Sequence, residues 1–143
     1  MMMTEKFKIL GKFIKDLSSE TPDVETYLFV RDRISNYQLN IDIKSKALKN
    51  KMIEVSTTFS FEDKENNKKK SHFEILHATV IKISDEVIEK KEMEKIILVE
   101  VPSKIYGELR KIFVSLFENS GFRDIKISEK VDFQKLYEMK KFQ

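Results

Sequence analysis

The chain contains no cysteine, no tryptophan, two prolines and three glycines among its 143 residues. The absence of cysteine excludes a disulfide framework and a zinc site built from thiolates, and it is typical of proteins from a reducing compartment. We therefore expect a cytoplasmic protein. Because 41% of the residues are hydrophobic, a chain of this length can bury a core without covalent staples, so we expect a single domain over residues 1–143.

Long apolar runs are also missing. No segment approaches the roughly 20 apolar residues of a membrane span, and the first residues lack the apolar core of a signal peptide. We expect a protein that is neither exported nor inserted into a membrane. Neither sign of charge dominates, since the chain has 27 basic and 24 acidic residues. The net charge of +3 is too small to indicate nucleic-acid binding by itself.

Groups that could carry catalysis are scarce. His72 and His77 are five positions apart, so on a strand they lie on opposite faces and cannot share a metal, which favours a structural or interface role. The glycines are too scattered for a phosphate-binding loop, and no serine lies in a nucleophile-elbow sequence. We predict no enzymatic activity, no metal and no cofactor. Lysines 68–70 leave nucleic-acid binding as an alternative of a different class, although acidic residues in the same segment repel phosphate.

The first half of the chain carries strand patterns. Apolar and polar residues alternate through 39–43 and 53–61, which predicts two strands with one buried face each. Residues 7–14 resemble an earlier strand, and residues 73–83 a later one that is apolar on both faces. The charged segment 62–70 contains an Asn pair and predicts a solvated loop. Residues 15–36 show no sustained period, so we expect a long connection there.

The second half changes to a helical period. Apolar residues from Ile105 to Phe117 share one face of a helix that follows Pro102 and stops before Gly121, a residue suited to a helix C-terminus. Asp132 can cap a final helix, and the helical content of residues 84–99 is left open.

Strands followed by helices predict an α+β fold, with a four-stranded antiparallel sheet and helices packed on one of its faces. Because the segment 73–83 is apolar on both faces, the second face of the sheet needs another cover. A second subunit provides it most simply, so we expect a homo-oligomer.

Three segments resemble the SecB family of protein-export chaperones. FIKDLSSETP at residues 13–22 is similar to the family's first-strand motif, LNIDI at 39–43 and MIEV at 52–55 to its next two strands, and VDFQKLY at 131–137 to the start of its closing helix. They occur in family order and spacing from Phe7 onward. The resemblance implies a homotetramer, built as a dimer of dimers, that holds unfolded preproteins without ATP and delivers them to the SecA translocase.

The same resemblance assigns residues to these roles. Leu39, Ile41, Ile43 and Tyr137 match positions that line the family's client groove, and ordinary core packing is the alternative for them. We expect aromatic residues of the segment 15–36, Tyr27 and Phe29, to form the other groove wall.

Two further sets complete the assignment. Asp16, Glu20 and Glu74 match acidic positions of the SecA-facing surface, where a solvated sheet face is the alternative, and the dimer–dimer contact is matched by Phe73, Ile75 and His77. A SecB-like chaperone dedicated to one partner, such as an antitoxin, remains the alternative of the same fold.

Overall fold

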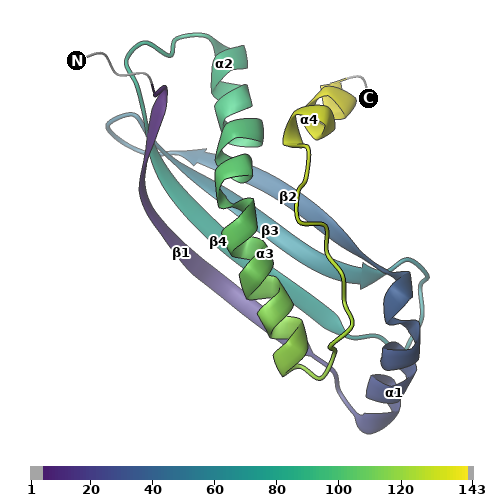
Figure 1. Cartoon of the computed structure of the whole chain (residues 1–143). Coiled ribbons are helices and arrows are strands. Elements are labelled where there is room, and N and C mark those ends of the chain that lie inside the picture. Colours follow the sequence, from purple (N-terminus) through teal and green to yellow (C-terminus); the bar gives the residue numbers. More distant parts are fainter. Residues whose placement is uncertain (1–4, 142–143) are drawn as a thin grey trace.

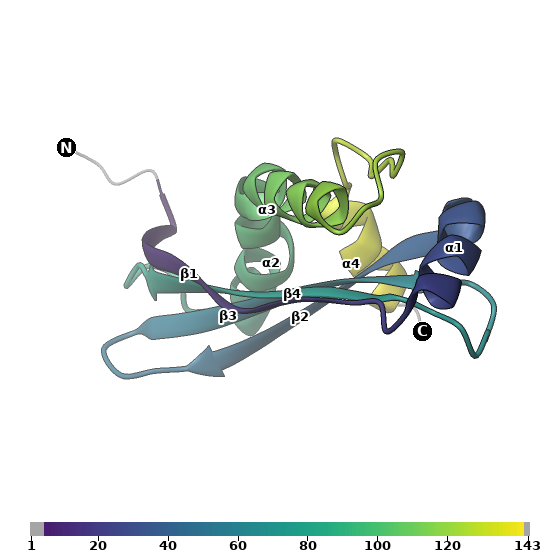
Figure 2. The ribbon, with the colours of Figure 1, turned by 90° about the horizontal axis from the view of Figure 1, so that it is seen from below.

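The protein is described by a computed structural model that places residues 5–141, with side chains for residues 5–139. Four long strands form one antiparallel sheet in the order β1-β4-β3-β2. Their bounds are β1 (Phe7–Glu20), β2 (Tyr37–Ala47), β3 (Met52–Asp63) and β4 (His72–Ile83). Figure 1 shows these strands beneath a long helix, and in Figure 2 the helices lie on one side of the sheet while the other side is bare. The predicted α+β architecture is confirmed.

Strand β1 is longer than the sequence predicts. Its residues from Asp16 to Glu20 pair with Leu76 to His72 of β4, so the strand continues to Glu20. The register shifts between Ile9 and Gly11 and again between Ile14 and Asp16. Each extra residue reverses the inward and outward alternation, which hides the strand from a search for period two.

The expected connection between β1 and β2 contains a helix, α1 (Val24–Arg33), followed by the 3-10 turn η1 (Ile34–Asn36). Asp23 caps α1, because its Oδ1 accepts a hydrogen bond from the Thr26 backbone N–H at 2.8 Å. Only Thr26 and Val30 of this helix are buried. Its apolar residues do not share a face, so no helical period marks it in the sequence.

The second half forms a nearly continuous helical rod: α2 (Lys90–Lys95), the π-type segment η2 (Ile96–Glu100) and α3 (Val101–Asn119). The helix predicted after Pro102 is confirmed, with Pro102 in its first turn. Gly121 follows α3 with a φ of 94°, which confirms its expected place beyond the helix end. The last helix is α4 (Phe133–Lys141), and Asp132 Oδ1 accepts a hydrogen bond from the Lys135 N–H at 3.0 Å.

The core between sheet and helices has two apolar clusters. The larger one joins Phe59, Phe61 and Phe73 of the sheet to Phe113 and Phe117 of α3, and the smaller one gathers around Ile53, Val55, Ile81 and Ile96. A buried polar strip, Thr57, His77 and Thr79, lies between them on the helix-covered side of β3 and β4. Their side-chain atoms Thr57 Oγ1, His77 Nδ1 and Thr79 Oγ1 have no hydrogen-bond partner among the described residues.

The residues expected at the dimer–dimer contact lie inside the protomer. Phe73 and Ile75 are fully enclosed and His77 is 3% exposed. These three residues face the helical layer, and the aromatic rings of α3 pack over Phe73 and Ile75, so their side chains do not reach the surface of the single chain. The opposite side of β4, which carries Leu76 and Val80, has no helix over it.

Candidate functional site

An apolar groove lies between β2 and α4. Leu39, Ile41 and Ile43 point to the helix-covered side of the sheet and are half-buried, because β2 is an edge strand with a neighbour on one side only. The groove has a volume of about 100 Å³ and is lined by Ile41, Ile43, Leu98, Phe133, Leu136 and Tyr137. Of these lining side chains, only Tyr137 carries a polar group. The structure therefore brings Tyr137 together with Ile41 and Ile43, as expected.

The Tyr137 hydroxyl fixes the position of α4. It donates a hydrogen bond to Glu94 Oε2 at 3.1 Å, and Glu94 belongs to α2. Loss of solvent contact, followed by this bond to the Glu94 carboxylate, raises the pKa of Tyr137. The hydroxyl thus stays protonated and remains a donor at neutral pH. The Phe133 side chain anchors the start of the helix, because its ring packs edge-on against Tyr106 with centroids 5.9 Å apart.

Three groove residues carry no assignment in the sequence analysis: Leu98, Phe133 and Leu136. Phe133 and Leu136 share a helical face with Tyr137, so the spacing of the last helix already contained the signal. Leu98 lies in η2, where the π-type turn interrupts the regular helical period.

Tyr27 and Phe29 do not line this groove. The Tyr27 hydroxyl donates to the Gly121 carbonyl at 2.7 Å, and its ring lies 5.2 Å from the Phe122 ring. It borders a separate hollow between α1 and the segment after α3. Phe29 is 36% exposed, with the Arg33 guanidinium 5.3 Å from its ring centroid. The second wall beside Ile41 and Ile43 is made by α4 and Leu98, not by α1.

The uncovered face of the sheet gathers carboxylates at one end. Ser18 lies directly opposite Glu74, with Asp16 opposite Leu76 and Glu20 opposite His72, so the three expected acidic residues occupy one corner. Asp42 of β2 and Glu62 of β3 project from the same face. We call these five residues, Asp16, Glu20, Asp42, Glu62 and Glu74, the acidic half of the open face.

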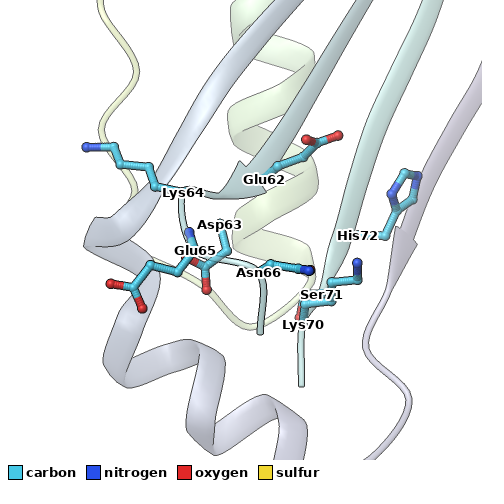
Figure 3. Close-up of a pocket in the computed structure, with 8 residues that line it drawn as sticks. All are labelled: Glu62, Asp63, Lys64, Glu65, Asn66, Lys70, Ser71 and His72. Atoms are coloured by element: carbon cyan, nitrogen blue, oxygen red, sulfur yellow. Dashed lines mark hydrogen bonds between the residues drawn. The ribbon is translucent and has the colours of Figure 1, made fainter. Parts of the chain in front are cut away.

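The β3–β4 loop borders the acidic half. Figure 3 shows Glu62 and His72 on neighbouring strands at the rim of this loop. Desolvation acts to raise the pKa of Asp63, but hydrogen bonds from the Glu65 N–H and Asn67, with Arg33 nearby, outweigh it and hold the pKa below its usual range. A charged Asp63 therefore organises the β3–β4 loop, which begins just after Glu62.

The two histidines lie on opposite faces, as predicted. His72 is on the open face, with its Nε2 3.5 Å from Glu74 Oε2, whereas His77 is buried beneath the helices. Burial lowers the pKa of His77. Residues 5–139 contain no group of His, Cys, Asp or Glu side chains that could hold a metal ion.

A second apolar surface follows the edge strand β1. Leu10, Phe13, Ile14 and Leu17 are between 41% and 50% exposed. Leu17 borders a hollow whose other side is formed by α3 residues, including Ile112 and Leu116. Lys12 Nζ reaches Glu108 Oε2 at 2.7 Å and ties this strand to α3. An exposed apolar surface therefore lies along β1, whereas Phe73 and Ile75 are enclosed.

Comparisons with known proteins agree on one family. A family model described as "Preprotein translocase subunit SecB" matches residues 2–143. A candidate protein-export protein SecB of Pelagibacter ubique (strain HTCC1062) is 55% identical over 138 residues, which cover 96% of this chain and 99% of the relative. The protein-export protein SecB of Bartonella quintana (strain Toulouse) is 24% identical over 132 residues, covering 92% of this chain and 82% of that protein.

A solved structure shares the fold. A SecB-like chaperone of Mycobacterium tuberculosis, solved with a peptide from the HigA1 antitoxin, superposes with a TM-score of 0.64. Its sequence is 8% identical, and the match covers 86% of this chain and 90% of that chain. Among residues 5–141, no helix has the length and apolar character needed to cross a membrane.

Proposed function

We propose that this chain, which belongs to the SecB family of protein-export chaperones, holds unfolded segments of preproteins in the groove between β2 and α4 and delivers them to SecA. It acts in the cytoplasm by binding, without nucleotide and without catalysis. The observation that carries this proposal is an apolar groove lined by Ile41, Ile43 and Leu136 on an edge strand, with Leu136 still 41% exposed at its rim.

The groove suits extended, apolar segments of varied sequence. Burying apolar surface stabilises a complex by about 25 cal/mol per Å² whatever the order of the side chains, so affinity does not depend on one sequence. The outer edge of β2 has no strand partner within the described residues. Its backbone N–H and C=O groups could therefore pair with a bound segment, which adds affinity that is also independent of sequence.

We propose that Tyr27 and Phe29 of α1 belong to a second contact for the client. Val24, Leu28 and Phe29 of α1 are exposed apolar residues, and Tyr27 borders its own hollow. A client longer than the groove at Ile41 would meet this surface as a second, weaker contact.

The acidic half of the open face is proposed to receive a basic segment of SecA. Asp16, Glu20 and Glu74 lie on adjacent strands at one corner, and Glu62 and Asp42 extend the negative surface across the sheet. Complementary charge mainly accelerates association and fixes the orientation of the partner. Client and SecA then occupy opposite faces of the sheet and do not compete.

We further propose a homotetramer formed as a dimer of dimers. The exposed apolar side chains of β1 and the hollow between Leu17 and α3 supply a contact surface. Phe73, Ile75 and His77 affect assembly indirectly in this proposal, by setting the position of α3 over the sheet.

A chaperone dedicated to one partner is the second candidate, because the Mycobacterium tuberculosis structure with the same fold holds an antitoxin peptide. The number of clients separates the two. A general chaperone delays the refolding of several unrelated precursors, whereas a dedicated one acts on its cognate partner alone.

The test is refolding of a slow-folding precursor in the presence of the protein without nucleotide. We expect the parent to delay refolding and Leu136→Asp to weaken client affinity by about tenfold or more, because a charge replaces a groove contact worth about 1.5–3 kcal/mol. Met139→Asp is the matched control, since Met139 lies on the same helix, is 55% exposed and does not line the groove. Circular dichroism and a measurement of the molecular mass should show that both variants keep the fold and the assembly of the parent.

Equal activity of Leu136→Asp and the parent would place the groove elsewhere. A parent that never delays refolding of unrelated precursors, yet binds one cognate protein, would favour the dedicated chaperone.

A further inference from the structure

The open face of the sheet is divided by charge, and the end opposite the acidic half is basic. Lys8 and Lys82 lie directly opposite each other on β1 and β4, and Lys46 projects from β2 in the adjacent row, opposite Glu54. Lys49 follows in the turn between β2 and β3. We call Lys8, Lys46, Lys49 and Lys82 the lysine end; all four are exposed.

Among the side chains that the structure describes, these lysines are not held in salt bridges, although Lys46 lies near Glu54 and Lys82 near Asp85. Within the described residues, none of the four takes part in a salt bridge, whereas the nearby acids Glu54 and Asp85 are bound by Lys15 and Lys51. Glu86 is a further exposed acid in the loop after β4. Like charges placed directly opposite on neighbouring strands destabilise a sheet. A bound anion would therefore reduce the electrostatic repulsion between Lys8 and Lys82.

Exposed apolar side chains accompany this charge. Leu48 in the β2–β3 turn is 36% exposed and Ile88 in the loop after β4 is 85% exposed. The two segments meet, because the Ile83 N–H donates to the Lys51 carbonyl at 2.9 Å. An end of the sheet that combines exposed lysines with apolar side chains in its two flanking loops matches the lipid interface, where phosphates attract the amines and the headgroup region accepts apolar groups.

We propose that the lysine end is a peripheral contact for an anionic phospholipid surface. The contact is made by one end of the sheet, with the strands inclined to the membrane surface, and it requires no inserted helix. This inference does not rest on the client groove or on the acidic half.

The acidic half does not prevent this contact. Glu74 and Lys82 are eight residues apart on β4, which corresponds to roughly 27 Å along an extended strand. Charges interact weakly beyond about 8 Å at physiological ionic strength. A protein that touches a membrane by its lysine end, with its strands inclined to the surface, therefore keeps its acidic half in solution, accessible to a basic partner.

The experiment is flotation of the full chain with vesicles of phosphatidylglycerol and phosphatidylcholine, compared with vesicles of phosphatidylcholine alone. We expect binding to the anionic vesicles only, with a loss as salt rises. The triple variant Lys8→Gln, Lys46→Gln, Lys82→Gln should bind at least about tenfold more weakly, because each lysine near the surface contributes to the attraction.

The matched control removes the same charge from the other end of the sheet. Lys64, Lys68 and Lys70 are exposed residues of the β3–β4 loop without a salt bridge among the described residues. Their triple Gln variant should bind anionic vesicles within about twofold of the parent. Equal losses in both variants would mean that net charge alone drives binding, and this would overturn the proposal.

The same variants also test whether the lysine end binds another class of anionic partner. If the parent ignores anionic vesicles but binds poly-glutamate or a single-stranded oligonucleotide through Lys8, Lys46 and Lys82, the lysine end receives an acidic polypeptide or a nucleic acid and the lipid proposal is wrong. Inorganic phosphate at millimolar concentration should not release the protein from vesicles. The refolding assay run on both triple variants separates this result from the client groove, since both should delay refolding as the parent does.

Discussion

Phe73 of β4 and Phe117 of α3 meet edge to face, with ring centroids 5.0 Å apart and ring planes at 90°. Both rings are fully enclosed by the protomer. Edge-to-face pairs add to the stabilisation from burial, so this contact holds α3 on the sheet. It also means that Phe73 stabilises the protomer before any assembly takes place.

We predict that Phe73→Ala lowers the free energy of unfolding by about 3–5 kcal/mol, because it leaves a cavity in the aromatic cluster. Urea denaturation measures this change. Ile88→Ala is the control, since Ile88 is 85% exposed and its truncation should alter stability by no more than about 0.5 kcal/mol. A Phe73→Ala variant that dissociates but keeps the unfolding free energy of the parent would restore Phe73 to a direct interface role.

The buried His77 predicts an acid-sensitive fold. Burial lowers its pKa in the folded state, while Glu108 and Lys12 exert smaller and opposing effects. As pH falls below the ordinary value of 6.5, the unfolded chain binds a proton that the folded chain does not, so stability is complete above that pH and declines below it. We expect the urea midpoint to fall between pH 7.5 and pH 5.5.

The variant His77→Gln should lose most of this pH dependence, and His72→Gln, which changes an exposed residue, should keep it. Carboxyl groups with shifted pKa values do not affect this pH range. The pKa values of Glu54, Asp63, Asp85 and Glu108 are lowered, so these groups bind protons only at more acidic pH. If His77→Gln loses stability at pH 5.5 as the parent does, the decline has another source.

The sequence predicts elements with a regular period and misses elements without one. Strand β3 alternates strictly because one face is covered by α3 and the other is open, and α3 has a continuous apolar face. By contrast, the two register shifts of β1 break its alternation, and α1 is stabilised by the Asp23 cap with little burial.

The grouping of the three acidic residues was predictable, because strand pairing alone decides it. Asp16, Glu20 and Glu74 come together because antiparallel pairing of β1 and β4 brings the end of one strand to the start of the other. The second wall of the groove at Ile41 was not predictable, since it depends on where α4 docks after a segment without regular structure. The burial of Phe73 and Ile75 was not predictable, because a strand that is apolar on both faces does not reveal which face a helix covers.

Assembly provides a further prediction. Leu17 is 43% exposed beside the α3 hollow, and Leu28 is 42% exposed on α1. If the β1 edge and α3 form the subunit contact, Leu17→Asp should convert the tetramer to smaller species, because an unpaired charge is costly to bury in an interface. Leu28→Asp should leave the mass unchanged.

Light scattering at micromolar concentration measures both variants against the parent. A monomeric parent would exclude the tetramer. If Leu28→Asp dissociates while Leu17→Asp keeps the mass of the parent, the subunit contact is formed by α1 and not by β1.

The last prediction concerns the acidic half. Replacing Asp16 by Asn and Glu20 and Glu74 by Gln keeps the side-chain shapes and removes three negative charges from one corner of the open face. We expect SecA binding to weaken by about three- to tenfold at low salt, with the loss mainly in the association rate, because these exposed charges attract a basic segment over a distance set by screening. At about 0.5 M salt the parent and the variant should bind alike.

The control variant removes three exposed carboxylates elsewhere, Glu118, Asp124 and Glu129, and has the same net charge. It should bind SecA as the parent does, and both variants should still delay refolding, since the groove at Ile41 lies on the opposite face of the sheet from Glu74. Glu62→Gln, added to the first variant, should weaken SecA binding further, because Glu62 projects from the same face beside His72. Equal SecA affinity for the parent and the first variant at low salt would exclude this corner as the SecA contact. An equal loss in the control would assign the effect to net charge rather than to these three positions.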